Sequence, residues 1–276
     1  MYLQGIYRIM KKKKTKYFIA LIAFLVVIAI GIVLILREAQ KRKSAAEKIE
    51  EITEVVNDVE PVKDEVEEMP YSNLGIEIPE KNLDWNKLHK ENEDIYAWIT
   101  VTDTTVDYPV LQHPTDNTYY LNNNIDGTPG YPGCIYTEDY NAKDFSDKNT
   151  VLYGHNLKDK TMFSSLHNYE EEDTFSKEQY IYIWTENDVF VYKVFAAYEY
   201  NSNHLLLNYD YNNEYVYEQY IKDILNVKDN GYGIANIKDD IDVTKEDRII
   251  TLSTCTTDHN SDQRFLVVGV LIPPEE

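Results

Sequence analysis

One cysteine in this sequence stands where its thiol could do chemistry. Cys255 ends the β-branched run RIITLSTC (248–255), nine positions before Arg264, and the chain of 276 residues contains one other cysteine. A thiol is a strong nucleophile only as the thiolate, so a reactive cysteine needs a neighbouring cation or a histidine that accepts its proton. An isolated strand cysteine is otherwise a small buried side chain. The two interpretations differ in whether such partners can be placed beside Cys255.

Among the six histidines, His155 is placed best to serve as that partner. It follows the strand-like run NTVLYG (149–154), in which Gly154 lets the backbone turn tightly. A β-barrel presents such a strand-end side chain to a cleft, although a histidine alone is as often structural as catalytic. The other five are assigned no chemistry: a helical pattern holds His89, a loop holds His113, and polar surroundings predict surface positions for His167, His204 and His259.

Arg264 could supply the third function that acyl transfer requires. Strand alternation places it on the opposite face from Phe265, and a hairpin across 255–264 would bring it beside Cys255. Its guanidinium stays charged and offers several N–H donors, which suits a carbonyl oxygen that develops negative charge. A strand arginine that simply faces solvent is the alternative. A nucleophile, a proton carrier and an oxyanion donor need no metal or other cofactor.

The N-terminal part of the sequence predicts a membrane anchor. Residues 17–36 are twenty consecutive residues without a charge, and at about 1.5 Å per residue a helix of that length spans roughly 30 Å of hydrocarbon. A cleaved signal peptide has a shorter apolar core and a small-residue cleavage site, which the following REAQKRK does not offer. The lysine-rich KKKKTK (11–16) is the denser basic flank, so we expect residues 1–16 in the cytoplasm and the remainder outside the cell.

Charge and composition divide the rest of the chain into a stalk and a single domain. Residues 1–48 contain 11 basic and 2 acidic residues, which leaves 16 basic and 46 acidic residues beyond them. Such an acidic surface repels nucleic acid, so nucleic-acid binding is excluded. Residues 37–70 are charged, poor in aromatics and interrupted by Pro61 and Pro70, as expected of an extracellular stalk. Residues 71–276 are enough for one domain that buries a core without disulfides.

Short β-branched and aromatic runs dominate this domain and predict a mainly β fold. They are separated by Gly, Asn and Asp, with a spacing typical of barrels. Two segments instead have helical spacing, 84–99 and 212–228. We therefore expect a closed β-barrel with an N-terminal helical addition and one helix inserted between late strands. The predicted strands are 149–154, 180–184, 188–200, 248–255 and 265–272.

Three short motifs behind the predicted anchor resemble those of the sortase family: YGHN (153–156), TLSTC (251–255) and RFLVVG (264–269). The predicted helix at 212–228 matches the insertion that sets class B sortases apart. The resemblance implies a sortase-like closed β-barrel behind an N-terminal transmembrane helix. Other segments similar to class B sortases are YAWITVTDTTVDYPVLQ (96–112), YYLNNNIDG (119–127), GCIYTEDYN (133–141) and NTVLYGHNLKDKTMFSSLHNY (149–169).

The resemblance also implies a function, that of a cysteine transpeptidase on the surface of a Gram-positive cell. Cys255 would attack the C-terminal sorting signal of a surface protein after its threonine and form a thioacyl enzyme. His155 would protonate the leaving amine, and Arg264 would hold the substrate carbonyl or its oxyanion. The acyl group would pass to an amine, typically that of a peptidoglycan precursor, and no cofactor is implied.

By alignment with the family, seven further residues are expected to line the groove for the sorting signal, although each could equally be a packing residue. Cys134 stands where the family commonly has a small residue such as serine, and we interpret it as a buried strand residue. The sequence leaves open whether the two cysteines pair. The loop 256–263 varies within the family, so Asp258 and His259 receive no catalytic role. The expected groove residues are Asn117, Leu121, Tyr153, Ser202, Leu206, Leu207 and Ser253.

Two other functions stay open at this point. A sortase-like enzyme could polymerise pilins, with a lysine amine of another subunit as the acceptor. Alternatively, Cys255 could be structural in a non-catalytic binding module. A polymerase would form covalent ladders with a lysine-bearing pilin, an anchoring enzyme would prefer a short amine such as glycine, and a binding module would do neither.

Overall fold

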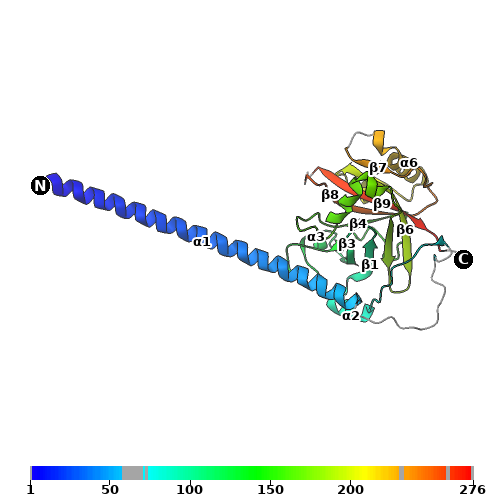
Figure 1. The fold of residues 1–276 in the computed structure, drawn as a ribbon, viewed down its shortest axis with the longest axis horizontal. Helices are drawn as coiled ribbons and strands as arrows, with labels where there is room; N and C mark the ends of the chain where they lie inside the picture. Colours follow the sequence, from blue (N-terminus) through cyan, green and yellow to red (C-terminus); the bar gives the residue numbers. More distant parts are fainter. Residues whose placement is uncertain (1, 58–70, 72–73, 230–232, 259–261, 275–276) are drawn as a thin grey trace. The chain divides into compact units, whose positions relative to one another are not determined.

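The computed structural model describes residues 2–57, 71, 74–229, 233–258 and 262–274. The chain divides into two compact units, residues 1–46 and 47–276. The first unit is the greater part of one long helix, and the second contains every strand among the described residues (Figure 1).

Helix α1 (Tyr2–Asn57) includes the predicted membrane span. Its segment Lys16–Thr53 has a window of mean hydropathy 3.5 and is long and apolar enough to cross a membrane. The helix does not end with the apolar residues 17–36. It continues into the predicted stalk 37–70, because this part of the sequence is rich in the helix-forming residues Ala, Glu and Lys. The remainder of that stalk, 58–70, lies outside the described residues.

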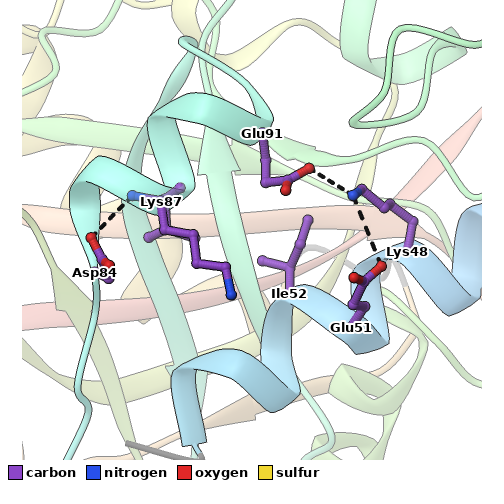
Figure 2. A pocket seen from close by; sticks show the side chains of 7 residues that line it. Lys48, Glu51, Ile52, Asp84, Lys87 and Glu91 are labelled. Carbon is purple, nitrogen blue, oxygen red and sulfur yellow. Dashed lines mark hydrogen bonds and ion pairs between the residues drawn. The ribbon is translucent and has the colours of Figure 1, made fainter.

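The last turns of α1 belong to the second unit and pack against it. Ile52 is buried among the apolar residues of that unit. Figure 2 shows the polar side of the contact, where Lys48 Nζ lies 2.7 Å from Glu91 Oε2 and 3.9 Å from Glu51 Oε2. Glu91 is the last residue of helix α2 (Trp85–Glu91). This part of the predicted stalk is therefore a docked helix end and not a solvated spacer.

The described strands form one sheet that closes on itself. They are β1 (Ile95–Val101), β2 (Asp107–Leu111), β3 (Ile135–Tyr136), β4 (Asn149–Tyr153), β5 (Tyr180–Trp184), β6 (Val189–Asn201), β7 (Ala235–Ile237), β8 (Ile249–Cys255) and β9 (Gln263–Ile272). The order β5-β1-β2-β3-β4-β8-β9-β6 returns to β5 through a β5–β6 pairing, which makes an eight-stranded barrel. The long β6 pairs with β5 over 189–193, with β7 over 196–198 and with β9 along its other edge. The predicted closed, mainly β barrel is confirmed.

Helix α6 (Glu214–Leu225) lies between β6 and β8 in the chain, where the sequence predicted an inserted helix. The Asn213 side chain caps it and accepts hydrogen bonds from the first backbone N–H groups. Its buried residues pack on the outer face of the sheet, which confirms the prediction for 212–228. The remaining short helices are α3 (Tyr119–Asn122), η2 (Ser164–Glu170), α4 (Glu172–Phe175), α5 (Leu205–Asn208) and η3 (Val227–Asp229).

Strand alternation separates the interior of the barrel from its outer face. One hydrophobic cluster has members on every strand of the barrel, and on β8 these are Ile250 and Leu252. A second cluster lies between α6 and the sheet, and it takes Ile249 from the same strand. Successive side chains of a strand point to opposite faces. The odd-numbered positions of β8 therefore face outward, and Cys255 is one of them.

The prediction of a helix across 84–99 is wrong in its second half. Helix α2 ends at Glu91, and 95–101 form β1, which pairs with β2 on one edge and β5 on the other. Asn92 ends the helix with extended backbone, while its side chain donates to the Ile125 carbonyl oxygen at 2.8 Å. The aromatic and β-branched run IYAWITV forms a central strand that is buried on both faces. Such a strand has no period-2 pattern to distinguish it from a helix.

Candidate active site

The ladder between β8 and β9 places Arg264 directly opposite Cys255. The pairing runs from Ile249↔Val270 to Cys255↔Arg264 without a shift in register. Opposite residues of an antiparallel pair have Cβ atoms about 4.5–5.5 Å apart and share one face of the sheet. On β9, Phe265 belongs to the interior cluster, so Arg264 faces outward as Cys255 does. The structure therefore brings these two predicted residues together.

The parallel pairing of β4 with β8 brings His155 to the same place. Its last pair is Tyr153↔Ser253, and the N–H of Gly154 donates to the Ser253 carbonyl oxygen at 3.1 Å. His155 and Cys255 each stand two residues beyond this pair, and the next residue, Asn156, reaches the Cys255 carbonyl oxygen with its Nδ2 at 3.2 Å. A Cβ on Gly154 would lie 2.5 Å from Ile135 Cδ1 and 2.6 Å from Phe163 Cδ2, so only glycine fits this approach. The three strands lie next to one another in Figure 1.

The imidazole of His155 is half-buried and held from two sides. Its Nε2 lies 2.8 Å from the Leu121 carbonyl oxygen, and its ring meets that of Tyr131 edge-on at a centroid distance of 4.9 Å. A carbonyl only accepts, so Nε2 carries a proton, and in the neutral ring Nδ1 is left as an acceptor. Burial lowers the pKa of His155, while the hydrogen bond to Leu121 acts in the opposite direction. The neutral imidazole is thus the favoured form at neutral pH.

Arg264 pairs with Tyr200 of β6 on one edge of its strand and with Cys255 of β8 on the other. Its Nη1 donates to the Gln263 carbonyl oxygen at 2.8 Å. Burial raises the pKa of Tyr136, and the charge of Glu138 raises it further, whereas the charge of Arg264 lowers it. A cation on the outer face, opposite the thiol, is a suitable donor for a developing oxyanion.

Three of the predicted groove residues lie around the catalytic candidates. Tyr153 and Ser253 are the paired residues that precede His155 and Cys255, and the Leu121 carbonyl binds the His155 ring. The Tyr153 ring stacks on Tyr136 at a centroid distance of 5.4 Å. Ser253 is buried, whereas Leu121 is 38% exposed. Leu121 therefore has a side chain available to a ligand, and Tyr153 and Ser253 form the floor beside it.

The other predicted groove residues are connected to this floor less directly. Leu206 and Leu207 line an open pocket of about 390 Å³ that also involves Tyr140, and Leu207 is 61% exposed. Ser202 is exposed just beyond β6. Asn117 is bound to the turn at Asp139, because its Nδ2 donates to Oδ1 at 2.7 Å.

The sequence missed a polar link that joins the 202–208 segment to the floor. Glu138 is buried, and its Oε1 lies 3.0 Å from His204 Nε2. Its Oε2 accepts a hydrogen bond from the Tyr153 hydroxyl at 3.1 Å. The sequence predicted a surface position for His204. The side chain is 33% exposed, but the prediction missed that one ring nitrogen is bound to a buried carboxylate. No sequence pattern connects residues 66 positions apart.

The prediction of a surface position is also wrong for His167. Its side chain is only 12% exposed, and its ring stacks on Phe265 at a centroid distance of 4.7 Å. Polar neighbours in the sequence suggested solvent, but η2 turns this side chain onto the end of β8. Asn156 is the last residue of the YGHN motif, and no role was predicted for it from the sequence. Its side chain donates to the Cys255 carbonyl oxygen at this strand end. His259 lies outside the described residues.

Both cysteines are free in the structure. Cys134 is 4% exposed and immediately precedes β3, and its Sγ lies 3.7 Å from the Asn123 carbonyl oxygen. Burial raises the pKa of the Cys134 thiol, with a smaller contribution from Asp126. The interpretation of Cys134 as a buried residue is therefore confirmed, and Cys255 is the cysteine with partial exposure.

Comparison with known proteins identifies the family. A family model described as a sortase domain matches residues 99–272. The chain belongs to the sortase family. Sortase B of Listeria monocytogenes is 34% identical over 208 residues, which cover 73% of this chain and 78% of that protein. Sortase B of Staphylococcus aureus is 31% identical over 189 residues, which cover 68% and 74%.

Solved sortase B structures are similar in fold. The Clostridium perfringens sortase B structure has a TM-score of 0.59 and 30% identity, and the match covers 68% of this chain and 99% of that chain. A Staphylococcus aureus sortase B–substrate complex has a TM-score of 0.57 and 32% identity over 68% of this chain and 84% of that chain. The protein is a class B sortase, and sortases are cysteine transpeptidases.

The buried imidazole leads to a prediction about protonation. We expect His155 to titrate below its ordinary pKa of 6.5, because burial disfavours the imidazolium. The folded state then binds this proton less readily than the unfolded state. The stability that His155 contributes is therefore present above about pH 6.5 and is lost as the pH falls below it.

NMR titration of the His155 ring checks this prediction. Tyr131→Ala uncovers the ring and is expected to move the pKa upward, and an unshifted or raised pKa in the unmodified protein would contradict the prediction.

Proposed function

We propose that this protein cleaves the C-terminal sorting signal of surface proteins after its threonine and transfers these proteins to an amine of the cell wall. The observation that supports this most directly is the pairing of Cys255 with Arg264 at the outer face of the barrel, beside the strand that leads to His155. The sortase family accounts for transpeptidation, and the Staphylococcus aureus sortase B relative has been solved with a substrate.

In the first half of the reaction, Cys255 gives its thiol proton to neutral His155, and the resulting thiolate attacks the threonine carbonyl carbon to form a C–S bond. The carbonyl electron pair moves to the oxygen, where the N–H donors of Arg264 stabilise the negative charge. The intermediate collapses, the C–N bond breaks, and the His155 imidazolium gives its proton to the leaving amine. A thioacyl enzyme and the released C-terminal peptide result.

In the second half, an acceptor amine attacks the thioacyl carbon. Neutral His155 takes the proton that this amine loses, and the C–S bond breaks to return the Cys255 thiolate. The proton taken from the acceptor replaces the one given to the leaving group, so the cycle is balanced. A lowered pKa suits this step, because a histidine that is neutral at working pH can accept a proton.

The sorting signal is proposed to lie on the outer face of the barrel, over the Tyr153–Ser253 pair. Exposed apolar side chains on both sides could contact it, and the His204–Glu138–Tyr153 link would hold the 202–208 segment in place. The proposed lining residues are Asn117, Leu121, Tyr153, Ser202, Leu206, Leu207 and Ser253.

Replacement of the nucleophile tests the proposal. Cys255→Ala should abolish cleavage of sorting-signal peptides and leave the fold intact, because the side chain is small and lies at a strand end. Cys134→Ser is the matched control, since that thiol is buried away from the outer face, and turnover should stay within about a few-fold. Peptide cleavage is followed by mass spectrometry. Cleavage retained by Cys255→Ala would refute the whole assignment.

The acceptor distinguishes anchoring from pilus assembly. With a wall-anchoring enzyme, the thioacyl intermediate should pass to a short amine such as glycine or to a peptidoglycan cross-bridge. A pilin polymerase would instead produce covalent ladders with a lysine-bearing pilin subunit. A binding module would transfer to neither.

Arg264→Lys separates an oxyanion donor from a simple cation. Lysine keeps the charge but loses the planar fork of N–H donors. Loss of one oxyanion donor lowers rates by about 10²–10³-fold, so we expect kcat/KM for peptide cleavage to fall by about that factor. Alkylation of Cys255 by iodoacetamide needs the thiolate and no oxyanion donor, and should change far less. If both rates fell together, Arg264 would act on the cysteine and not on the substrate.

The location of the domain is a further part of the proposal. One N-terminal helix is long and apolar enough to cross a membrane. We propose a single-pass anchor through 17–36, with residues 1–16 in the cytoplasm and the catalytic domain outside. Protease added to intact cells without their walls should digest the domain and spare the N-terminal segment. A fully protected domain would show the opposite orientation.

A further inference from the structure

The backbone carbonyl of Cys255 is bound by two side chains that the catalytic mechanism does not use. His167 Nε2 lies 3.0 Å from this carbonyl oxygen. Asn156 Nδ2 lies 3.2 Å from the same oxygen and 3.2 Å from the Thr256 carbonyl oxygen. Cys255 is the last residue of β8, so these contacts hold the strand where its ladder ends.

The second ring nitrogen of His167 also faces an acceptor. Its Nδ1 lies 2.5 Å from Glu170 Oε1, on the same helix η2. The Thr257 hydroxyl donates to that carboxylate oxygen at 2.9 Å and lies 3.1 Å from Nδ1. The strand end is thus connected to Glu170 both through His167 and through Thr257.

A proton count indicates the form of His167 that this arrangement favours. The Cys255 carbonyl and the Glu170 carboxylate can only accept, whereas a neutral imidazole has a single N–H to donate. The imidazolium has two and satisfies both. In the neutral form with the proton on Nδ1, Nε2 would turn a lone pair toward the carbonyl and could accept only from Asn156 Nδ2, 3.0 Å away. The protonation state therefore decides whether His167 binds the Cys255 carbonyl.

Both carboxylates and a cation lie on the described elements around His167. Glu170 is on η2, Glu199 is on β6 opposite Phe265, and Asp258 follows β8. Arg264 is on β9, whose Phe265 stacks on the His167 ring. Of these charged groups, Glu170 is in direct contact with the ring.

We propose that His167, bound to Glu170 through Nδ1, is a positioning residue that donates its Nε2 proton to the Cys255 carbonyl and fixes the nucleophile at the end of β8. It acts through the backbone, from the side of the sheet opposite the thiol. The inference rests on the proposed function of Cys255 as the nucleophile. Its physical basis is that a misplacement of about 1 Å can lower a rate by about 10²-fold.

Two substitutions of His167 in the full-length protein test the donor. His167→Phe keeps a ring that can stack on Phe265 but has no N–H, whereas His167→Gln keeps an amide N–H that can reach the carbonyl. We expect His167→Phe to lower kcat for peptide cleavage by about 10–100-fold with little change in KM, and His167→Gln to recover most of that loss. His89→Gln, on α2, is the matched control and should retain the original rate.

The hydrogen-bond donor is tested independently of turnover. In ¹⁵N NMR spectra of the full-length protein, Nε2 of His167 should carry a proton, as expected of a ring nitrogen that donates to a carbonyl oxygen. This readout reports the donor itself and does not require cleavage of a substrate.

These measurements separate the failure of this inference from failure of the proposed function. If the unmodified protein did not cleave sorting signals, the proposed function would fail while the NMR result still reported the state of His167. An Nε2 of His167 that carries no proton, unchanged kcat in His167→Phe, or equal losses in the Phe and Gln variants would each overturn the positioning role. Equal losses would indicate that the side chain only fills space.

Discussion

The register of β8 between β4 and β9 is the constraint on which the active site depends. Side chains alternate across a sheet, so a slip of one residue would turn Cys255 into the barrel and Leu252 out of it. Arg264 is opposite Cys255 because the β8–β9 ladder has no shift, and His155 follows because the β4–β8 ladder has none. His155 comes from a part of the sequence far from Cys255 and Arg264, and the backbone ladders of β4, β8 and β9 bring together the strand ends that carry all three.

Buried side chains on both faces hold this register. Inside the barrel, Leu252 and Phe265 are fully buried, and on the outer face α6 covers Ile249. The Tyr217 hydroxyl lies 3.0 Å from the carbonyl oxygens of both Lys148 and Asp247, which precede β4 and β8. The inserted helix therefore joins the beginnings of the two strands whose ends form the active site. Helix α6 therefore affects the geometry of the candidate site although it supplies none of the catalytic candidates.

Features that depend on a local sequence pattern could be predicted from the sequence. Features that are set by tertiary contacts could not. Cys255, His155 and Arg264 could be selected because each lies at the end of a strand-like run. Residues 95–99 could not be recognised as a strand, because β1 is buried on both faces and its apolar spacing also fits a helix. The α6 helix could be predicted because its polar side is exposed.

The environments of the two histidines beside Cys255 show the same limit and suggest a division of roles. His155 lies on the outer face, where burial lowers its pKa and favours the neutral ring. His167 lies beneath the strand, where its two ring nitrogens face the Glu170 carboxylate and the Cys255 carbonyl. In the proposed mechanism His155 exchanges a proton with substrate, whereas His167 is bound at both nitrogens and suits a fixed position. Neither environment is visible in the sequence, where both residues are histidines among polar neighbours. The difference arises from the residues that the fold packs against each ring: both rings meet a carbonyl oxygen and an aromatic ring, and His167 contacts the Glu170 carboxylate in addition.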